Sequence, residues 1–93
     1  MERIKGTFRR NGQHVAEGAD VFLYVDVSVE PPMWFGSFEL PPEAQMSQPG
    51  DYEVEFADGR HGIVTVSLRP LLGEFQYGGF TGNGALNEAT QLS

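Results

Sequence analysis

The residues of this chain best suited to acid–base chemistry are its two histidines, His14 and His61. His61 lies in the phrase VEFADGRHG, directly after an Asp-Gly turn signal, and Glu55 lies in the same phrase before the turn. If the chain folds back at this turn, Glu55 and His61 face each other across two strands on the outer surface. A carboxylate beside an imidazole can orient the ring for general base catalysis. Glu55 and His61 are therefore the candidate residues for a ligand-binding or enzymatic pocket.

The sequence lacks most of the other residues that such catalysis or ligand binding would require. There is no cysteine, and therefore no thiolate nucleophile, disulfide or thiolate metal site. No serine lies in a strand–turn–helix elbow, and the acidic residues lack the alternate spacing of a calcium loop. The phrase GGFTGNG, residues 78 to 84, lacks the following helix and the nearby basic residue of a phosphate loop. We therefore predict no catalytic residue, no metal and no cofactor, and the balance leans against an enzyme.

The distribution of charge bears on the partners of the protein. Thirteen acidic and six basic residues give a net charge of −7. A body of this charge repels nucleic acid and anionic membranes. The basic residues Arg3, Lys5 and Arg9 lie on one predicted strand, which could bind a single nucleic acid strand. Such binding also needs exposed aromatic residues, and these are mostly expected in the core. Nucleic acid is therefore not a favoured partner. The opening residues MERIKGTF contain no apolar run typical of a signal peptide or membrane span, so we expect a cytoplasmic protein with no membrane partner.

Two turn signals and the alternation around them indicate how these residues are positioned. Asn11-Gly12 predicts a type I′ turn, which pairs Phe8 with Val15 on the apolar face. At the Asp-Gly signal, a two-residue turn would put two valines of the following strand on the wrong face, because a slip of one residue reverses every side chain. We therefore predict a type I turn followed by Gly59 with positive φ, forming a G1 bulge.

The longest apolar pattern lies in ADVFLYVDVSVE, residues 19 to 30. Alternate residues from Val21 to Val29 form an unbroken stripe, which we expect in the core, and Pro31-Pro32 ends this strand. The next segment, MWFGSFEL, turns Trp34 toward the same interior.

A second set of apolar residues falls on the opposite face of these strands. A chain of 93 residues without helices can fill one interior but cannot cover a second apolar face. Exposed apolar patches of this kind mark interfaces or ligand grooves. An alternative is that a bulge, for instance at Gly36, turns some of these side chains inward. The predicted partner-binding residues are Phe22, Tyr24, Met33, Phe35 and Ile63.

Together these patterns predict an all-β protein, a small antiparallel barrel or two-sheet sandwich of about six or seven short strands. Residues 1–77 form this single domain, and residues 78–93 form a Gly-rich, loosely ordered C-terminal tail. The favoured function is a non-catalytic interaction module that self-associates or docks a protein partner through its aromatic face. The alternative is a small-molecule-binding or enzymatic barrel with a pocket near Glu55 and His61.

Overall fold

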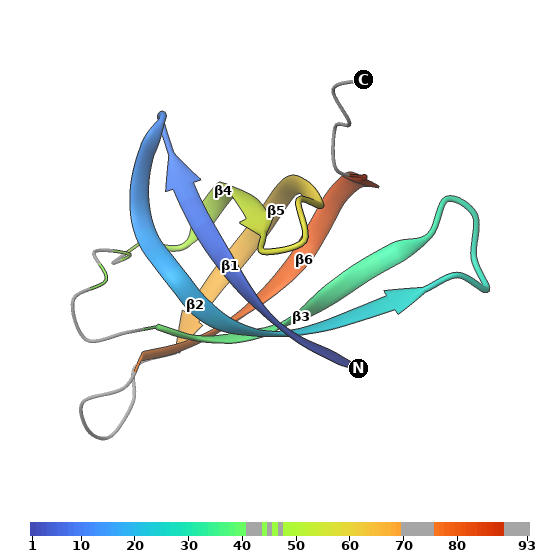
Figure 1. Ribbon diagram of the computed structural model, residues 1–93, viewed down its shortest axis with the longest axis horizontal. Coiled ribbons are helices and arrows are strands. Elements are labelled where there is room, and N and C mark those ends of the chain that lie inside the picture. Colours follow the sequence, from blue (N-terminus) through green and yellow to red (C-terminus); the bar gives the residue numbers. More distant parts are fainter. Residues whose placement is uncertain (41–43, 45, 47, 70–75, 89–93) are drawn as a thin grey trace.

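The protein is an antiparallel barrel of six strands, closed in the order β1-β2-β3-β6-β5-β4 (Figure 1). The computed structural model describes residues 1–40, 44, 46, 48–69 and 76–88. The strands are β1 (Glu2–Arg10), β2 (Gln13–Asp26), β3 (Met33–Leu40), β4 (Gly50–Phe56), β5 (His61–Arg69) and β6 (Gln76–Asn87). The predicted all-β fold is confirmed, and of the two architectures considered the closed barrel is the correct one.

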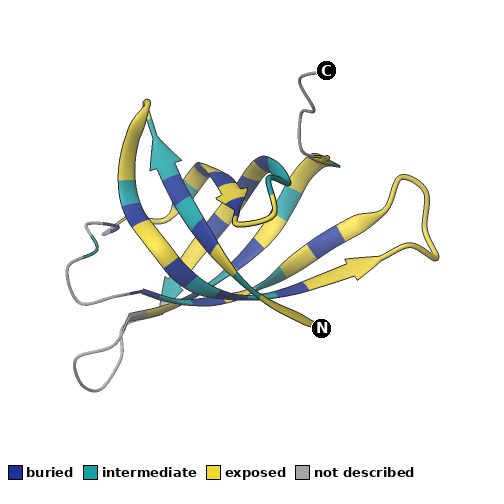
Figure 2. Cartoon of the chain, in the orientation of Figure 1, coloured by how far each residue is buried: buried dark blue, intermediate teal, exposed yellow. Residues whose placement is uncertain are grey.

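The interior is built by the period-two alternation of the strands, visible in Figure 2 as alternating dark and light bands. On β4, for example, Tyr52 and Val54 are buried whereas Glu53 and Glu55 are exposed. The same alternation persists through Gly36, because the pairing of β2 with β3 is continuous along β3. The hydrophobic core consists of Phe8, Ala16, Ala19, Val21, Leu23, Trp34, Phe38, Leu40, Met46, Tyr52, Val54, Phe56, Val64, Val66 and Phe80.

The two predicted turns form, but one strand register differs from the prediction. Asn11 and Gly12 have φ angles of 53° and 79°, as a type I′ turn requires. Phe8, however, pairs with Ala16 and not with Val15, because the register shifts between Phe8 and Arg9. Such a bulge bends a strand and increases its twist. The long β2 needs this curvature to wrap around a barrel of only six strands.

The turn between β4 and β5 has the predicted geometry. Gly59 has a φ of 93°, and its N–H donates to the carbonyl of Phe56 at 2.8 Å. The N–H of Phe56 in turn donates to the carbonyl of Arg60, also at 2.8 Å. This bulge sets the register that places Glu55 opposite His61. The predicted G1 bulge is confirmed.

The predicted boundary at residue 77 is wrong, because β6 continues to Asn87 between β3 and β5. The glycines of this segment have a packing role. A Cβ on Gly78 would lie 2.3 Å from the Phe38 ring, and one on Gly82 would lie 2.2 Å from the Trp34 ring. Residues 78 to 87 therefore form the strand that lets large core rings approach its backbone. Residues 89–93 of the expected tail lie outside the described residues.

The ends of β2 and β3 extend away from the barrel as a two-stranded arm, residues 24–35 (Figure 1). The pairing of β1 with β2 reaches only Leu23, and the pairing of β6 with β3 begins at Phe35. The predicted core stripe is therefore correct for Leu23 but wrong beyond it, since Val25 is exposed and the side chain of Val27 is 78% exposed. Between Tyr24 and Met33 no described strand pairs with the outer edges of the arm, and Tyr24, Val25, Val27, Val29, Met33 and Phe35 are exposed, whereas Trp34 points back into the core.

Candidate functional site

The centre of the candidate site is a pair of stacked rings on the outer face of the arm. Tyr24 of β2 and Phe35 of β3 are direct cross-strand partners. Their ring centroids lie 5.5 Å apart and their planes differ by 5°. The two residues are 43% and 42% exposed, respectively. Cross-strand pairing thus holds two aromatic rings side by side and leaves their outer surfaces free.

Two further predicted residues flank this stack along the strands. Met33, which is 53% exposed, pairs with Asp26 toward the tip of the arm. Phe22 lies on the other side of the stack and is partly buried, since the guanidinium of Arg3 lies 5.9 Å from the centroid of its ring. We call Phe22, Tyr24, Met33 and Phe35 the aromatic face. The structure brings these four of the five predicted partner-binding residues together.

Ile63, the fifth predicted residue, lies elsewhere. It is on β5, separated from Phe35 by β6, and pairs with Glu53 and Asn83. It lines a shallow depression together with Arg9 and Glu53. Ile63 is exposed as predicted, but its neighbours are polar and it does not extend the aromatic face.

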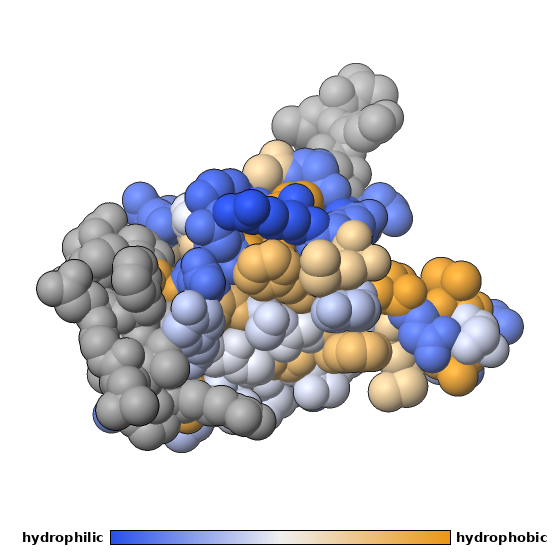
Figure 3. Space-filling view, turned by 90° about the horizontal axis from the view of Figure 1, so that it is seen from below, coloured by the Kyte–Doolittle hydropathy of each residue, from blue (hydrophilic) through white to orange (hydrophobic). Residues whose placement is uncertain are grey.

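The sequence prediction missed a second apolar surface on the arm. Val25, Val27 and Val29 are exposed there, although alternation assigned them to the core. In Figure 3 hydrophobic side chains gather at the projecting right-hand end of the molecule, which is the arm of Figure 1. One feature of the sequence could have predicted the exposure of these valines. The stripe from Val21 to Val29 is longer than one wall of a small barrel can bury.

Charges of opposite sign lie at the two ends of the aromatic face. At the barrel end, Lys5 Nζ lies 2.8 Å from the carboxylate of Asp20, and Arg3 lies 3.8 Å from the same carboxylate. The hydrogen bond from Lys5 lowers the pKa of Asp20, and the two positive charges add to this effect. At the tip, the carboxylate of Asp26 accepts hydrogen bonds from the hydroxyl and the backbone N–H of Ser28, at 2.6 and 2.9 Å. These bonds lower the pKa of Asp26, which is therefore ionised at neutral pH.

Glu55 and His61 are strand neighbours, as predicted, but among the described residues they border different depressions. Glu55 borders a depression of about 200 Å³ with Lys5 and Thr7. His61 borders another of about 240 Å³ with Arg9 and Glu53. Glu55 is exposed, and no hydrogen bond joins it to His61 in the described part of the chain. In this part of the chain, the expected pocket near Glu55 and His61 is therefore divided between two depressions.

The remaining polar groups offer little chemistry of another kind. Among the residues that the structure describes, no three His, Asp or Glu side chains come together in a way that could hold a metal ion. His14 is exposed, with its Nδ1 2.7 Å from the carboxylate of Glu17 near the first turn. In the described ranges there is also no helix of the length and apolarity needed to span a membrane.

Comparisons of the chain with protein-family models, with curated proteins and with solved structures give no match.

Proposed function

We propose that this protein is a non-catalytic interaction module that binds a protein partner through the aromatic face on its β2–β3 arm. One observation carries the proposal: Tyr24 and Phe35 are stacked on a projecting two-stranded arm, and each is more than two-fifths exposed. Monomeric proteins rarely expose contiguous apolar patches, and those that exist are commonly interaction sites. Tyr and Phe are also among the residues enriched at interface centres.

The exposed rings supply part of the free energy that binding requires. A fully buried aromatic side chain hides ~150–250 Å². At ~25 cal/mol per Å², covering the exposed parts of two such rings contributes on the order of 4 kcal/mol before the costs of association. Met33, on the same face, enlarges the apolar area.

The backbone of the arm supports the same proposal. An isolated two-stranded ribbon is only marginally stable in water. Residues 24–26 of β2 and Met33 of β3 have no neighbouring strand on their outer edges within the described ranges. A partner that packs on the rings would therefore also stabilise the arm that presents them.

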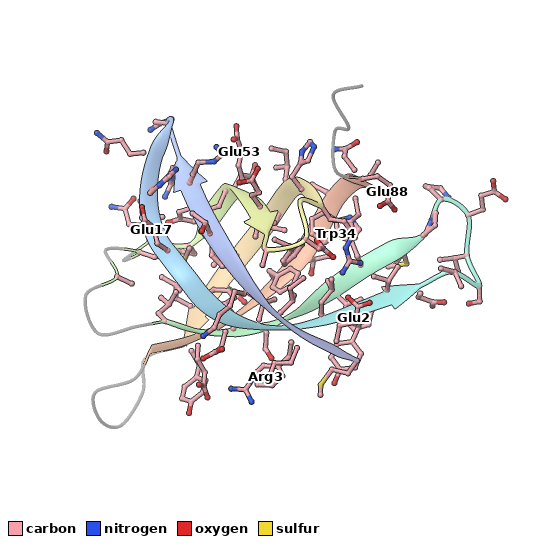
Figure 4. The ribbon with its side chains drawn as sticks, in the orientation of Figure 1. Glu2, Arg3, Glu17, Trp34, Glu53 and Glu88 are labelled. Carbon is pink, nitrogen blue, oxygen red and sulfur yellow. The ribbon has the colours of Figure 1, made fainter. Side chains whose placement is uncertain are left out.

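Site-specific photo-crosslinking tests the proposal. A photoreactive residue, Phe35→p-benzoylphenylalanine, is introduced into the full chain, which is expressed in its native cells and irradiated. We expect a covalent adduct with a protein, either a second copy or a different chain. The matched control places the same residue at Glu53, which projects from the side of the barrel away from Arg3 (Figure 4). Adducts of equal yield from both positions, or none from Phe35, would overturn the proposal.

A further inference from the structure

We infer that the partner of the aromatic face is a second copy of this chain, bound face to face in antiparallel orientation about a two-fold axis at the Tyr24–Phe35 stack. In this dimer Arg3 of each copy pairs with Asp26 of the other. The inference rests on the proposed function and deepens it by naming the partner. It follows from the order of residues along the face, from their charges and from symmetry.

The first step is the spacing of residues along β2. Phe22 lies two positions from Tyr24 toward the barrel, and Asp26 lies two positions from Tyr24 toward the tip. Both separations are about 6.6 Å along a strand. A two-fold axis that crosses the strands at Tyr24 therefore brings Tyr24 onto Tyr24 of the second copy. The same rotation brings Asp26 of the second copy over Phe22.

The second step is the position of Arg3. Its guanidinium already lies 5.9 Å from the centroid of the Phe22 ring, which is where Asp26 of the second copy arrives. The Arg3 side chain is 69% exposed, and its present contact with Asp20 is a long one of 3.8 Å, whereas Lys5 lies 2.8 Å from that carboxylate. A guanidinium carries five N–H donors, so Arg3 has donors left for a second carboxylate.

The third observation concerns the charge and the hydrogen bonds of Asp26. Its carboxylate is exposed and ionised, and its hydrogen bonds come from Ser28 alone among the described residues. No cation lies within 4 Å of it in that part of the chain. An ionised carboxylate accepts several hydrogen bonds, so Asp26 retains acceptor sites for an arginine.

The symmetry of a two-fold interface favours a second copy of this chain over a different chain as the partner. A two-fold interface needs a surface that is complementary to itself, with residue i contacting residue j and the reverse. The aromatic face has this property, since Arg3 lies beside Phe22 at its barrel end, Asp26 lies at its tip and the stacked rings lie between them. A uniformly basic partner would meet Arg3, and a uniformly acidic partner would meet Asp26. Either mismatch opposes binding.

The test is a charge-swap series measured by sedimentation equilibrium and light scattering at 0.15 M salt, where the mutual repulsion of two chains of charge −7 is screened. We expect the wild-type chain of 10.3 kDa to form a concentration-dependent dimer. Arg3→Glu alone and Asp26→Lys alone should each raise the dissociation constant about tenfold or more, because each reversal creates two like-charge contacts in a two-fold interface. The double variant, Arg3→Glu with Asp26→Lys, should return to within about threefold of wild type, because both contacts are again between opposite charges.

Two further variants serve as controls for the change in net charge. Arg9→Glu and Glu55→Lys change the net charge by the same amounts but lie outside the aromatic face, and they should leave the dimer unchanged. Far-UV circular dichroism checks that each variant folds. A wild-type chain that stays monomeric, or a double variant that fails to recover, overturns the inference. If the Phe35 photo-crosslinker then captures a different protein, the proposed function stands without it.

Discussion

At the scale of single residues, Trp34 organises one end of the barrel. Its indole Nε1 donates a hydrogen bond to the carbonyl of Gly84 at 3.0 Å. Its ring lies 6.3 Å from that of Phe56 and 6.2 Å from that of Phe80, centroid to centroid. The ring is thus held from several sides and has little freedom to move. It also packs directly on the backbone of β6 at Gly82.

The close approach of Trp34 to Gly82 leads to a stability prediction. A Cβ on Gly82 would lie 2.2 Å from the indole, a distance that forces the ring or the strand to shift. We expect Gly82→Ala to lower the free energy of unfolding by about 1–3 kcal/mol, the usual cost of overpacking a core. Urea denaturation followed by the fluorescence of Trp34, the single tryptophan, measures this change.

The matched control for this prediction is Gly79→Ala on the same strand. There the nearest atom would be 3.7 Å from the new Cβ, which is an ordinary contact. We expect the control to change the free energy of unfolding by less than about 0.5 kcal/mol, or to increase it slightly. A loss for Gly82→Ala as small as the one expected for the control would show that the indole can move aside.

At the scale of elements, the β4–β5 turn is tied to the start of β1 by Arg60. The Nε of Arg60 donates to the carboxylate of Asp58 at 2.8 Å, and its Nη2 donates to the carboxylate of Glu2. The backbone N–H of Arg60 also donates to Asp58, at 3.1 Å. Asp58 and Arg60 of the phrase DGR thus fix the turn and join it to a neighbouring strand.

This cluster predicts a dependence of stability on pH. Desolvation raises the pKa of Asp58, but the hydrogen bonds from Arg60 outweigh it and hold that pKa below its ordinary value. The unfolded chain therefore binds the proton more readily, so the stabilisation is complete above about pH 4 and is lost as pH falls through the folded-state pKa. We expect Asp58→Asn to cost about 0.2–1 kcal/mol at pH 6, the range for exposed ion pairs, and progressively less as pH falls through the folded-state pKa.

Urea titrations of both chains from pH 7 to pH 2 measure this difference. Glu88→Gln, which removes an exposed carboxylate of the same charge, serves as the control and should show no such convergence with wild type. A stability gap between wild type and Asp58→Asn that does not narrow as pH falls from 7 to 2 would mean that the pairing with Arg60 is not its source.

The elements also indicate what the sequence could and could not predict. Alternation correctly placed Val21 and Trp34 inward and Tyr24 outward, because a strand next to a filled interior follows a period of two. The positive φ of Gly59 was predictable because only one register satisfied the apolar pattern. The exposure of Val27 was not predictable from alternation. It depends on where β1 and β6 stop pairing, which is a property of the whole barrel.

The same distinction applies to the candidate site. The pairing of Glu55 with His61, and the outward direction of Tyr24 and Phe35, followed from local register. The separation of Ile63 from Phe35 did not, because it depends on β6 lying between β3 and β5. In the sequence, most of β6 is a glycine-rich segment. It could not be identified as a strand, because glycine has no side chain whose alternation could mark one.

At the scale of the whole molecule, β6 is the strand that closes the barrel. It pairs with β3 on one side and β5 on the other, and contributes Phe80 to the core. Without it, β3 and β5 would each present an unpaired edge. The apolar rings of Trp34 and Phe38 would also lose the backbone on which they pack.

A chain that ends after Tyr77 tests this role directly, since it keeps every residue of the domain that the sequence pattern suggested. We expect it to show no cooperative urea transition and a Trp34 emission typical of a solvated indole, because closure and core are lost together. Phe80→Leu in the full chain is the control. It keeps the strand and most of the apolar volume, and should unfold cooperatively with a loss of only about 1–1.5 kcal/mol. A truncated chain that unfolded with a full-length denaturant slope would mean that five strands suffice, and that residues 78 to 87 are dispensable for the fold.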